Sequence, residues 1–229
     1  MIFAAGEGRR MRPLTLTTPK PLLPVGDYSL LEHLIRRLQA AGISDLVINV
    51  SYLAEQVIAA LERIDLNGMA CQVSVEERPL ETGGGLKRAL PYLGDAPFLL
   101  VNSDVWFDID YRNVVNEGLP ASALAHLLLV ASPQHNQSGD FVINQRGQVH
   151  VKSDTDQPAD CLTFSGVSVI HPELVHRYSD KREAFPLRDL LYGAIGDKRV
   201  TGEYATAYWS DVGTPERLED VRARYLSSD

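Results

Sequence analysis

The chain has 229 residues, of which 45% are hydrophobic and 23% are charged, and its formal net charge is −8 at pH 7. The length suffices for one substantial core, and the negative charge argues against nucleic acid as the main partner because phosphate backbones need a positive surface. No apolar run reaches the roughly 20 residues that span a bilayer, and no stretch is typical of a signal peptide, so we expect a cytoplasmic protein with free thiols at Cys71 and Cys161 that contacts no membrane.

The first half of the chain predicts helices and strands in alternation. Residues 29–42 have apolar positions at helical spacing, with a capping box from Ser29 to Glu32 and a stop at Gly42. Strands are then expected at 45–52, 71–78 and 97–105, and helices at 54–64 and 84–93. Short connections between such elements imply parallel strands with right-handed crossovers, and hence an α/β three-layer sandwich.

From about residue 120 the pattern becomes more antiparallel. Residues 121–132 predict a buried strand, although this apolar run also suits a helix, and residues 140–151 predict a hairpin that turns at Arg146-Gly147. Further strands are expected at 162–172 and 200–213, and helices near 172–178, 186–195 and 214–226. No linker or repeat interrupts the chain, so we expect one domain over residues 1–229.

Glycines and basic residues crowd the first twenty positions. Gly6 and Gly8 directly follow a short apolar strand, where glycine permits positive φ and lets backbone N–H groups approach a ligand. A tight turn with solvated arginines explains the glycines equally well. The dinucleotide-binding motif G-x-G-x-x-G requires a small residue where this chain has Met11, and the P-loop motif G-x-x-x-x-G-K-[ST] does not occur. Lys20, held between two prolines on a stiff segment, favours a local site for a small polyanion.

Residues 4–26, "AAGEGRRMRPLTLTTPKPLLPVG", resemble the signature of the nucleotidylyltransferases that join a sugar 1-phosphate to a nucleoside triphosphate. The resemblance continues through residues 79–106, 162–172 and 209–218, and so covers essentially the whole chain. Within the family the motifs are most similar to those of the N-acetylmuramic acid 1-phosphate uridylyltransferases. The resemblance implies a three-layer Rossmann-like nucleotidyltransferase sandwich with a mostly parallel, mixed central sheet.

The resemblance also implies an activity. The expected reaction is Mg²⁺-dependent uridylyl transfer from UTP to N-acetylmuramic acid 1-phosphate, with release of pyrophosphate, in peptidoglycan recycling. The partners would be these small molecules, and the protein a monomer or weak homodimer. The nucleotide would bind to the half of about 1–110, and the half of about 111–229 would bind the sugar and supply the second metal ligand.

Three other functions stay open. The first is another sugar-1-phosphate nucleotidylyltransferase, such as a mannose 1-phosphate guanylyltransferase. The second is a metal-dependent glycosyltransferase, whose D-x-D motif is matched only formally by residues 108–110. The third is a catalytically inactive sugar-nucleotide sensor or subunit.

Site residues follow from the matched motifs. Because a phosphate monoester is largely dianionic at pH 7, the reaction needs no general base and depends on cations and N–H groups that bring two polyanions together. Arg10 and Lys20 are the expected catalytic residues, whereas Arg9 and Arg12 are expected to be solvated. The nucleotide is expected at Ala4, Ala5, Gly6, Glu7, Gly8, Lys20, Glu81, Thr82, Gly83, Gly84 and Asn102. The sugar is expected at Asn102, Phe164, Ser165 and Gly166.

Two aspartates are the expected Mg²⁺ ligands. Asp104 ends a buried parallel strand, at the edge where open α/β sheets bind ligands. Asp211 follows a second strand-like stretch and precedes a helix that starts at Thr214. Mg²⁺ takes one or two carboxylates and completes its shell with water and phosphate oxygens. Either aspartate alone suits a turn or a helix cap, and the resemblance implies that the two bind the metal together.

Three features depart from the family pattern. Ser103 stands where the family has glycine, which adds a Cβ beside the nucleotide or metal. The Glu-Lys-Pro motif that contacts the sugar phosphate in many relatives is absent before residue 162, and Lys152 is the candidate replacement. Met1 aligns with an internal position of the family's first strand, which predicts a frayed outer end and two to four residues upstream.

Overall fold

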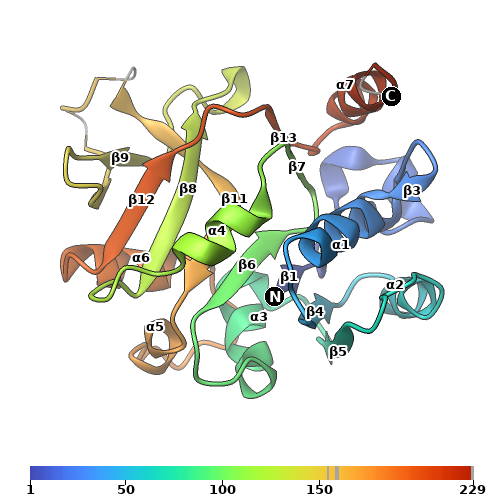
Figure 1. Ribbon diagram of the computed structural model, residues 1–229, viewed down its shortest axis with the longest axis horizontal. Coiled ribbons are helices and arrows are strands. Elements are labelled where there is room, and N and C mark those ends of the chain that lie inside the picture. The colour runs from blue at the N-terminus through green and yellow to red at the C-terminus, as the bar shows by residue number, and fades with distance from the viewer. Residues whose placement is uncertain (154, 158–159, 228–229) are drawn as a thin grey trace.

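Nine strands form one mixed sheet within the residues that the computed structural model describes, which are 1–153, 155–157 and 160–227 (Figure 1). They are β1 (Ile2–Phe3), β4 (Asp45–Val50), β5 (Ala70–Val75), β6 (Phe98–Asn102), β8 (Ala125–Ala131), β9 (Phe141–Ile143), β10 (Val149–Val151), β11 (Leu162–Ile170) and β12 (Val200–Tyr204). Their order is β10-β9-β11-β6-β1-β4-β5, with β8 also paired to β11 and β12 paired to β8. Two further pairs lie outside this sheet, β2 (Pro24–Val25) with β3 (Tyr28–Ser29) and β7 (Val105–Phe107) with β13 (Trp209–Asp211).

The two halves of the sequence pair differently within the sheet. β1 lies between β4 and β6 and is parallel to both, with Ile2 opposite Ile48 and Val101. β11 is antiparallel to β6 and β8, and β9 and β10 form the predicted hairpin. The predicted mixed α/β sheet is confirmed. Residues 121–132 contain a strand and no helix, and because this strand is buried along most of its length its apolar run lacks the alternation that would have identified it.

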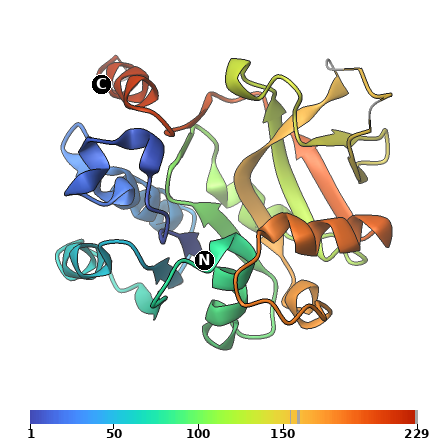
Figure 2. The same cartoon turned by 180° about the vertical axis from the view of Figure 1, so that it is seen from behind.

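Helices cover both faces of the sheet. They are α1 (Leu30–Ala40), α2 (Ala54–Leu61), α3 (Glu81–Ala89), α4 (Tyr111–Glu117), α5 (Glu173–His176), α6 (Leu187–Gly196) and α7 (Pro215–Leu226). α1, α2 and α4 share one core cluster that includes Leu34 and Val57, and α3, α5 and α6 share another that includes Leu86 and Leu190. Figure 2 shows α6 on the face opposite α1. This is the predicted three-layer arrangement. Among the described residues, no helix is both long and apolar enough to cross a membrane.

The predicted N-terminus of α1 is confirmed, whereas the predicted bounds of α3 are shifted. The Ser29 hydroxyl accepts a hydrogen bond from the Glu32 N–H at 3.2 Å, as a capping box requires. The Glu32 carboxylate binds Arg36 at 2.9 Å. Of the two hydrogen bonds of a capping box, the structure therefore shows the one that the Ser29 hydroxyl accepts. α3 begins at Glu81, earlier than predicted, and the end of the predicted helix becomes a 3₁₀ turn at Leu90–Tyr92.

The strand predicted at 97–105 is divided in two. β6 ends before Ser103 and Asp104, which form a turn, and β7 then leaves the main sheet to pair with β13. The last predicted strand is divided in the same way between β12 and β13. Asp211 lies opposite Val105 in the β7-β13 pair, so this division brings the chain around both predicted metal ligands together.

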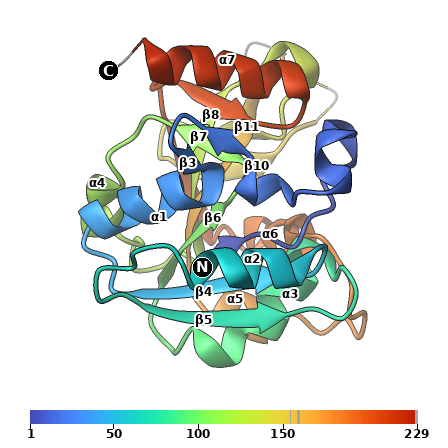
Figure 3. The ribbon, with the colours of Figure 1, turned by 90° about the vertical axis from the view of Figure 1, so that its right-hand side faces the viewer.

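A third core cluster joins the two ends of the chain. Its buried members include Met11, Leu23, Trp106, Val212 and Leu218. Figure 3 shows α7 lying above the β2-β3 hairpin and α1. The opening loop and the segment after β13 are therefore held against each other by a shared hydrophobic core.

The outer end of β1 is hydrogen-bonded to β6. The Met1 amino group donates a hydrogen bond to the Leu99 carbonyl oxygen at 2.6 Å, and the Val101 N–H donates to the Met1 carbonyl oxygen at 2.9 Å. Burial lowers the pKa of the Met1 amino group to about 5. The prediction of a frayed end is wrong, because Met1 is buried and both of its backbone polar groups are hydrogen-bonded to β6.

Candidate active site

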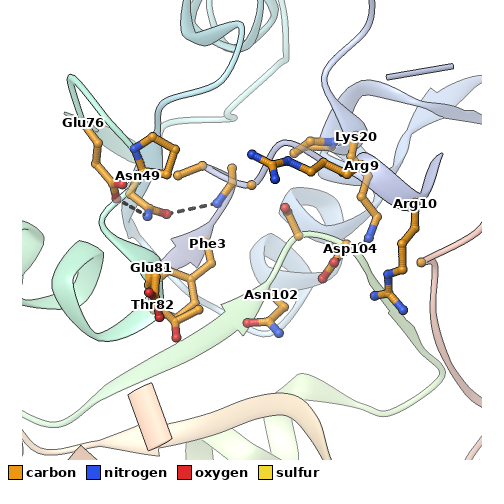
Figure 4. Close-up of a pocket in the computed structure, with 18 residues that line it drawn as sticks. Phe3, Arg9, Arg10, Lys20, Asn49, Glu76, Glu81, Thr82, Asn102 and Asp104 are labelled. Carbon is orange, nitrogen blue, oxygen red and sulfur yellow. Dashed lines mark hydrogen bonds and ion pairs between the residues drawn. The ribbon is translucent and has the colours of Figure 1, made fainter. Parts of the chain in front are cut away.

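A cavity of about 370 Å³ opens where β1, β4 and β6 end at their carboxyl termini (Figure 4). This is the edge at which open α/β sheets bind ligands. Many of the predicted site residues line it, namely Ala4, Ala5, Gly6, Gly8, Arg10, Lys20, Glu81, Thr82, Asn102 and Asp104. The fold thus gathers residues from three separate parts of the sequence around one cavity.

The two glycines of the opening loop have different surroundings. Gly8 has φ +60°, and a Cβ added there would lie 3.1 Å from Thr15 Cγ2 and 3.2 Å from Lys20 Cβ. A Cβ added at Gly6 would meet no atom within 4 Å. Backbone geometry and close packing therefore explain Gly8, whereas the space beside Gly6 is open toward the cavity.

Lys20 and Asp104 form an ion pair inside the cavity. Lys20 Nζ lies 2.6 Å from Asp104 Oδ2, and the side chains are 8% and 37% exposed. Burial raises the pKa of Asp104, but the charge and hydrogen bond of Lys20, a backbone hydrogen bond and the charge of Arg10 together bring it below its ordinary value. Asp104 is therefore an ionised carboxylate at neutral pH and can bind a cation.

The arginines of the loop divide into two groups. Arg10 lines the cavity near Lys20 and Asp104, as Figure 4 shows. Arg9 also lines the cavity, although its side chain is 74% exposed and its Nε donates to Glu7 at 2.6 Å. Arg12 lies 3.8 Å from the same carboxylate. Glu7 does not line the cavity, because its side chain is held by these two arginines, and its part in nucleotide binding stays a prediction.

Asp211 lies beside Asp104 along the backbone, but its carboxylate is occupied. The Val212 N–H donates to the Asp104 carbonyl oxygen at 2.8 Å. The Asp211 carboxylate binds Arg217, and His135 Nε2 lies 3.0 Å from it. In the part of the chain that the structure describes, no three His, Cys, Asp or Glu residues are grouped as a ready metal site.

The donor chemistry of the two aspartates nevertheless suits Mg²⁺. Carboxylate oxygens are ligands that Mg²⁺ prefers, and it needs only one or two of them when phosphates and water supply the rest. Each carboxylate carries a basic partner, Lys20 on Asp104 and Arg217 on Asp211. A bound Mg²⁺ would have to displace these partners, and two substrate polyanions would be available to receive them.

The glycines at the start of α3 pack against the chain before α6. The N–H groups of Gly83 and Gly84 donate to the Phe185 carbonyl oxygen at 2.8 and 3.0 Å. A Cβ at Gly83 would lie 2.5 Å from the Phe185 ring. Neither glycine lines the cavity, and close packing accounts for both of them. Glu81 and Thr82 do line it, and Glu81 holds a left-handed φ of +59°, a conformation that is costly for a residue with a side chain.

The residues predicted for the sugar form a β-bulge in β11. The register with β8 shifts between Phe164 and Ser168, and Gly166 has φ +84°. A Cβ at Gly166 would lie 2.8 Å from Asn102 Nδ2. Ser165 is fully buried and its carbonyl accepts a hydrogen bond from Trp209 Nε1 at 2.8 Å. The three bulge residues do not line the cavity, but Gly166 packs against Asn102, which does. Sugar binding by these residues stays a prediction.

The departures from the family pattern are accommodated without strain. Ser103 is not among the described residues with positive φ. Its N–H donates to the Phe3 carbonyl oxygen at 3.0 Å, and its side chain is buried at the cavity wall. Lys152 does not line the cavity, and its Nζ donates to the Ser138 carbonyl oxygen at 3.1 Å.

A buried polar network on the cavity wall was missed from the sequence. Asn49 Oδ1 accepts a hydrogen bond from the Ala4 N–H at 3.0 Å, and its Nδ2 donates to Glu76 Oε1 at 2.6 Å (Figure 4). The other Glu76 oxygen accepts from the Leu80 N–H at 3.0 Å. This network joins the opening loop to the loop before α3. The polar Asn49 within an otherwise apolar strand was the signal that could have identified it.

A glycine-rich loop, a buried lysine and an ionised aspartate meet at the carboxyl edge of a mixed α/β sheet, where Rossmann-like folds bind their ligands. The chain belongs to the nucleotidyl transferase family, whose sequence model matches residues 1–228.

The relatives agree with this assignment. The chain is 41% identical to the N-acetylmuramate alpha-1-phosphate uridylyltransferase of Neisseria meningitidis serogroup B over 97% of this chain and 96% of that protein. It is 33% identical to the Caulobacter vibrioides protein of the same name, over 98% and 95%. A solved UDP-glucose pyrophosphorylase superposes with a TM-score of 0.78 at 17% identity, covering 100% of this chain and 98% of the other. The predicted fold class and family resemblance are confirmed.

Proposed function

We propose that the protein transfers a uridylyl group from UTP to N-acetylmuramic acid α-1-phosphate, which yields the UDP-sugar and pyrophosphate. The observation that supports the chemistry most strongly is the meeting of Arg10, Lys20 and Asp104 in one cavity beneath an open glycine loop. The choice of UTP and of this sugar rests on the relative that is 41% identical along nearly the whole chain. Both substrates would be small molecules, and the product would enter peptidoglycan recycling.

The reaction is a displacement at the α-phosphorus of UTP. An oxygen of the sugar phosphate forms the new P–O bond, and the bond from the α-phosphorus to the bridging oxygen breaks as pyrophosphate leaves. The attacking phosphate is already largely dianionic, so no proton must be removed. The protein's task is to position two polyanions and to neutralise the charge that gathers on the leaving group.

The residues of the cavity suit this task. The N–H groups of Gly6 and Gly8 and the guanidinium of Arg10 would hold the triphosphate. Lys20 would leave Asp104 to neutralise the α-phosphate and the attacking phosphate. Asp104 and Asp211 would hold Mg²⁺, which supplies further positive charge to the triphosphate.

The test is a grid of nucleoside triphosphates against sugar 1-phosphates, scored by pyrophosphate release. We expect the highest kcat/KM for UTP with N-acetylmuramic acid 1-phosphate. Faster turnover of GTP with mannose 1-phosphate would replace the proposed substrates. Release of nucleoside diphosphate from an NDP-sugar without pyrophosphate would indicate a glycosyltransferase, and no turnover across the grid with Mg²⁺ would indicate a sensor or subunit.

A further inference from the structure

Arg217 is a basic residue at the edge of the proposed active site, within the matched stretch 209–218 but without a predicted role. It lies in the first turn of α7, and its side chain is only 17% exposed. Its guanidinium binds the Asp211 carboxylate, and its Nη1 lies 2.8 Å from His135 Nε2. The side chain is therefore largely buried beside one of the two candidate metal ligands and is not part of the solvated surface of the helix.

Gly213 connects Arg217 to the cavity. Gly213 lines the cavity wall, and a Cβ added there would lie 2.5 Å from Arg217 Nη2 and 3.1 Å from Arg10 Nη2. Two guanidinium groups from opposite ends of the sequence thus approach one backbone position, and Arg10 is the one of the two that Figure 4 shows at the cavity. Like charges held this close repel each other, and an anion placed between them is attracted by both.

The proposed reaction needs a cation for a second polyanion. Arg10 is assigned to the triphosphate of UTP, and Lys20 is shared between the α-phosphate and the attacking group. Lys20 alone is so far assigned to the sugar phosphate, because Arg9 is paired with Glu7 and mostly exposed. Lys152, the candidate replacement for the missing Glu-Lys-Pro motif, is bound to the Ser138 carbonyl away from the cavity.

We propose that Arg217 binds the phosphate group of the sugar 1-phosphate and thereby sets the enzyme's preference for a phosphorylated sugar. This inference rests on the proposed function. The planar guanidinium matches a phosphate with two parallel hydrogen bonds, and a phosphate dianion competes with the single negative charge of Asp211 for it. Transfer of Arg217 from Asp211 to the phosphate releases that carboxylate at the moment when the substrate arrives.

The test compares Arg217→Gln and Arg217→Lys with a matched arginine on the same helix. Arg222→Gln is the control, because Arg222 binds the Pro24 carbonyl oxygen at 2.9 Å and Glu219 at 2.6 Å, and neither partner lines the cavity. The measurements are KM for each substrate by pyrophosphate release, and the Kd of the sugar 1-phosphate by calorimetric titration with EDTA present. The thermal midpoint of each variant checks folding.

For Arg217→Gln we expect a roughly 10- to 100-fold weaker affinity for the sugar 1-phosphate, as loss of a charged hydrogen bond implies, with KM for UTP changed by less than about twofold. Arg217→Lys should recover part of the affinity, because it keeps the charge but not the two parallel hydrogen bonds. Arg222→Gln should match the wild type. If Arg217→Gln does not fold, Arg217→Lys carries the test alone. The inference then requires that Arg217→Lys bind the sugar 1-phosphate more weakly than the wild type does, with unchanged affinity for UTP.

Unchanged sugar 1-phosphate affinity in Arg217→Gln, or an equal loss of UTP affinity, would overturn the inference about Arg217. The proposed function would still stand in that case, provided that the wild-type protein turns over its substrates. A wild-type protein that releases no pyrophosphate from UTP with any sugar 1-phosphate would overturn the proposed function itself. The two failures are therefore distinguished by the wild-type measurement.

Discussion

The parallel strands have a cavity at each end, and the two differ in chemistry far more than in size. The cavity at the carboxyl ends has a volume of about 370 Å³ and is lined by glycines, Arg10, Lys20 and Asp104. The cavity at the amino ends has a volume of about 340 Å³ and is lined mostly by apolar side chains, among them Leu38 and Phe98. Size therefore does not identify the active site, whereas charge and exposed backbone do.

The difference follows from how strands begin and end in this fold. At the carboxyl ends, strands lead into loops that carry the glycines and cations, and the space beside Gly6 is open. At the amino ends, apolar side chains such as Ile43, Leu46 and Leu99 line the second cavity. Substitutions at the first cavity should alter turnover, and changes at the second should alter stability.

Removal of the Lys20 ammonium should have the largest effect. Lys20→Ala removes the cation assigned to the α-phosphate, and we expect kcat to fall on the order of 10²-fold or more, as for loss of one transition-state donor. Arg12→Ala, a loop arginine that lies outside the cavity, is the control and should retain near-wild-type kcat. Steady-state assay of pyrophosphate release measures both. Near-normal turnover in Lys20→Ala would remove the basis for placing catalysis at this edge.

The opening loop was predictable because its information is local. Gly6, Gly8 and Lys20 lie within fifteen residues, and a strand, a loop and a proline-flanked lysine suffice to predict an anion site there. The buried Glu76-Asn49 contact joins residues 27 positions apart in two strands, and no short-range pattern encodes that distance. Local spacing therefore predicts a glycine-rich anion site in this loop, but it does not predict the buried network that holds the loop.

The C-terminal half of the site was less predictable for a different reason. Asp211 was identified from its motif, but its contact with Arg217 and His135 depends on how β13 leaves the main sheet. The contact between the C-terminal half and Gly83 and Gly84 was equally hidden: both glycines pack against Phe185, and their predicted part in nucleotide binding stays a prediction. A run of glycines indicates that another group packs close to the backbone, but only the three-dimensional fold shows whether that group is a ligand or a side chain such as Phe185.

Substitutions at the two loop glycines should affect different properties: Gly8→Ala should lower stability, and Gly6→Ala should weaken nucleotide binding. Gly8→Ala places a side chain at φ +60° and within 3.2 Å of Lys20 Cβ, so we expect a loss of about 1–2 kcal/mol in the free energy of unfolding. Gly6→Ala meets no atom within 4 Å, so stability should be unchanged while KM for UTP rises. Urea unfolding and steady-state kinetics measure the two effects. Equal destabilisation by both substitutions would contradict the distinction.

The smallest effect is expected from filling the second cavity. Val169 is 6% exposed on β11 and lines the apolar cavity at the amino ends. Val169→Ile adds one methylene group at the wall of this cavity, and if the group is accommodated there the free energy of unfolding should rise by up to about 0.8 kcal/mol. Val167, fully buried on the same strand and outside that cavity, supplies the matched control, because Val167→Ile adds the same group to a packed site and should destabilise. Chemical denaturation of both variants, with kcat measured alongside, tests the contrast. A rise in stability at Val169 with unchanged kcat would assign the second cavity to packing alone, and a change in kcat would connect it to the active site through β6, which Val169 pairs with at Leu99.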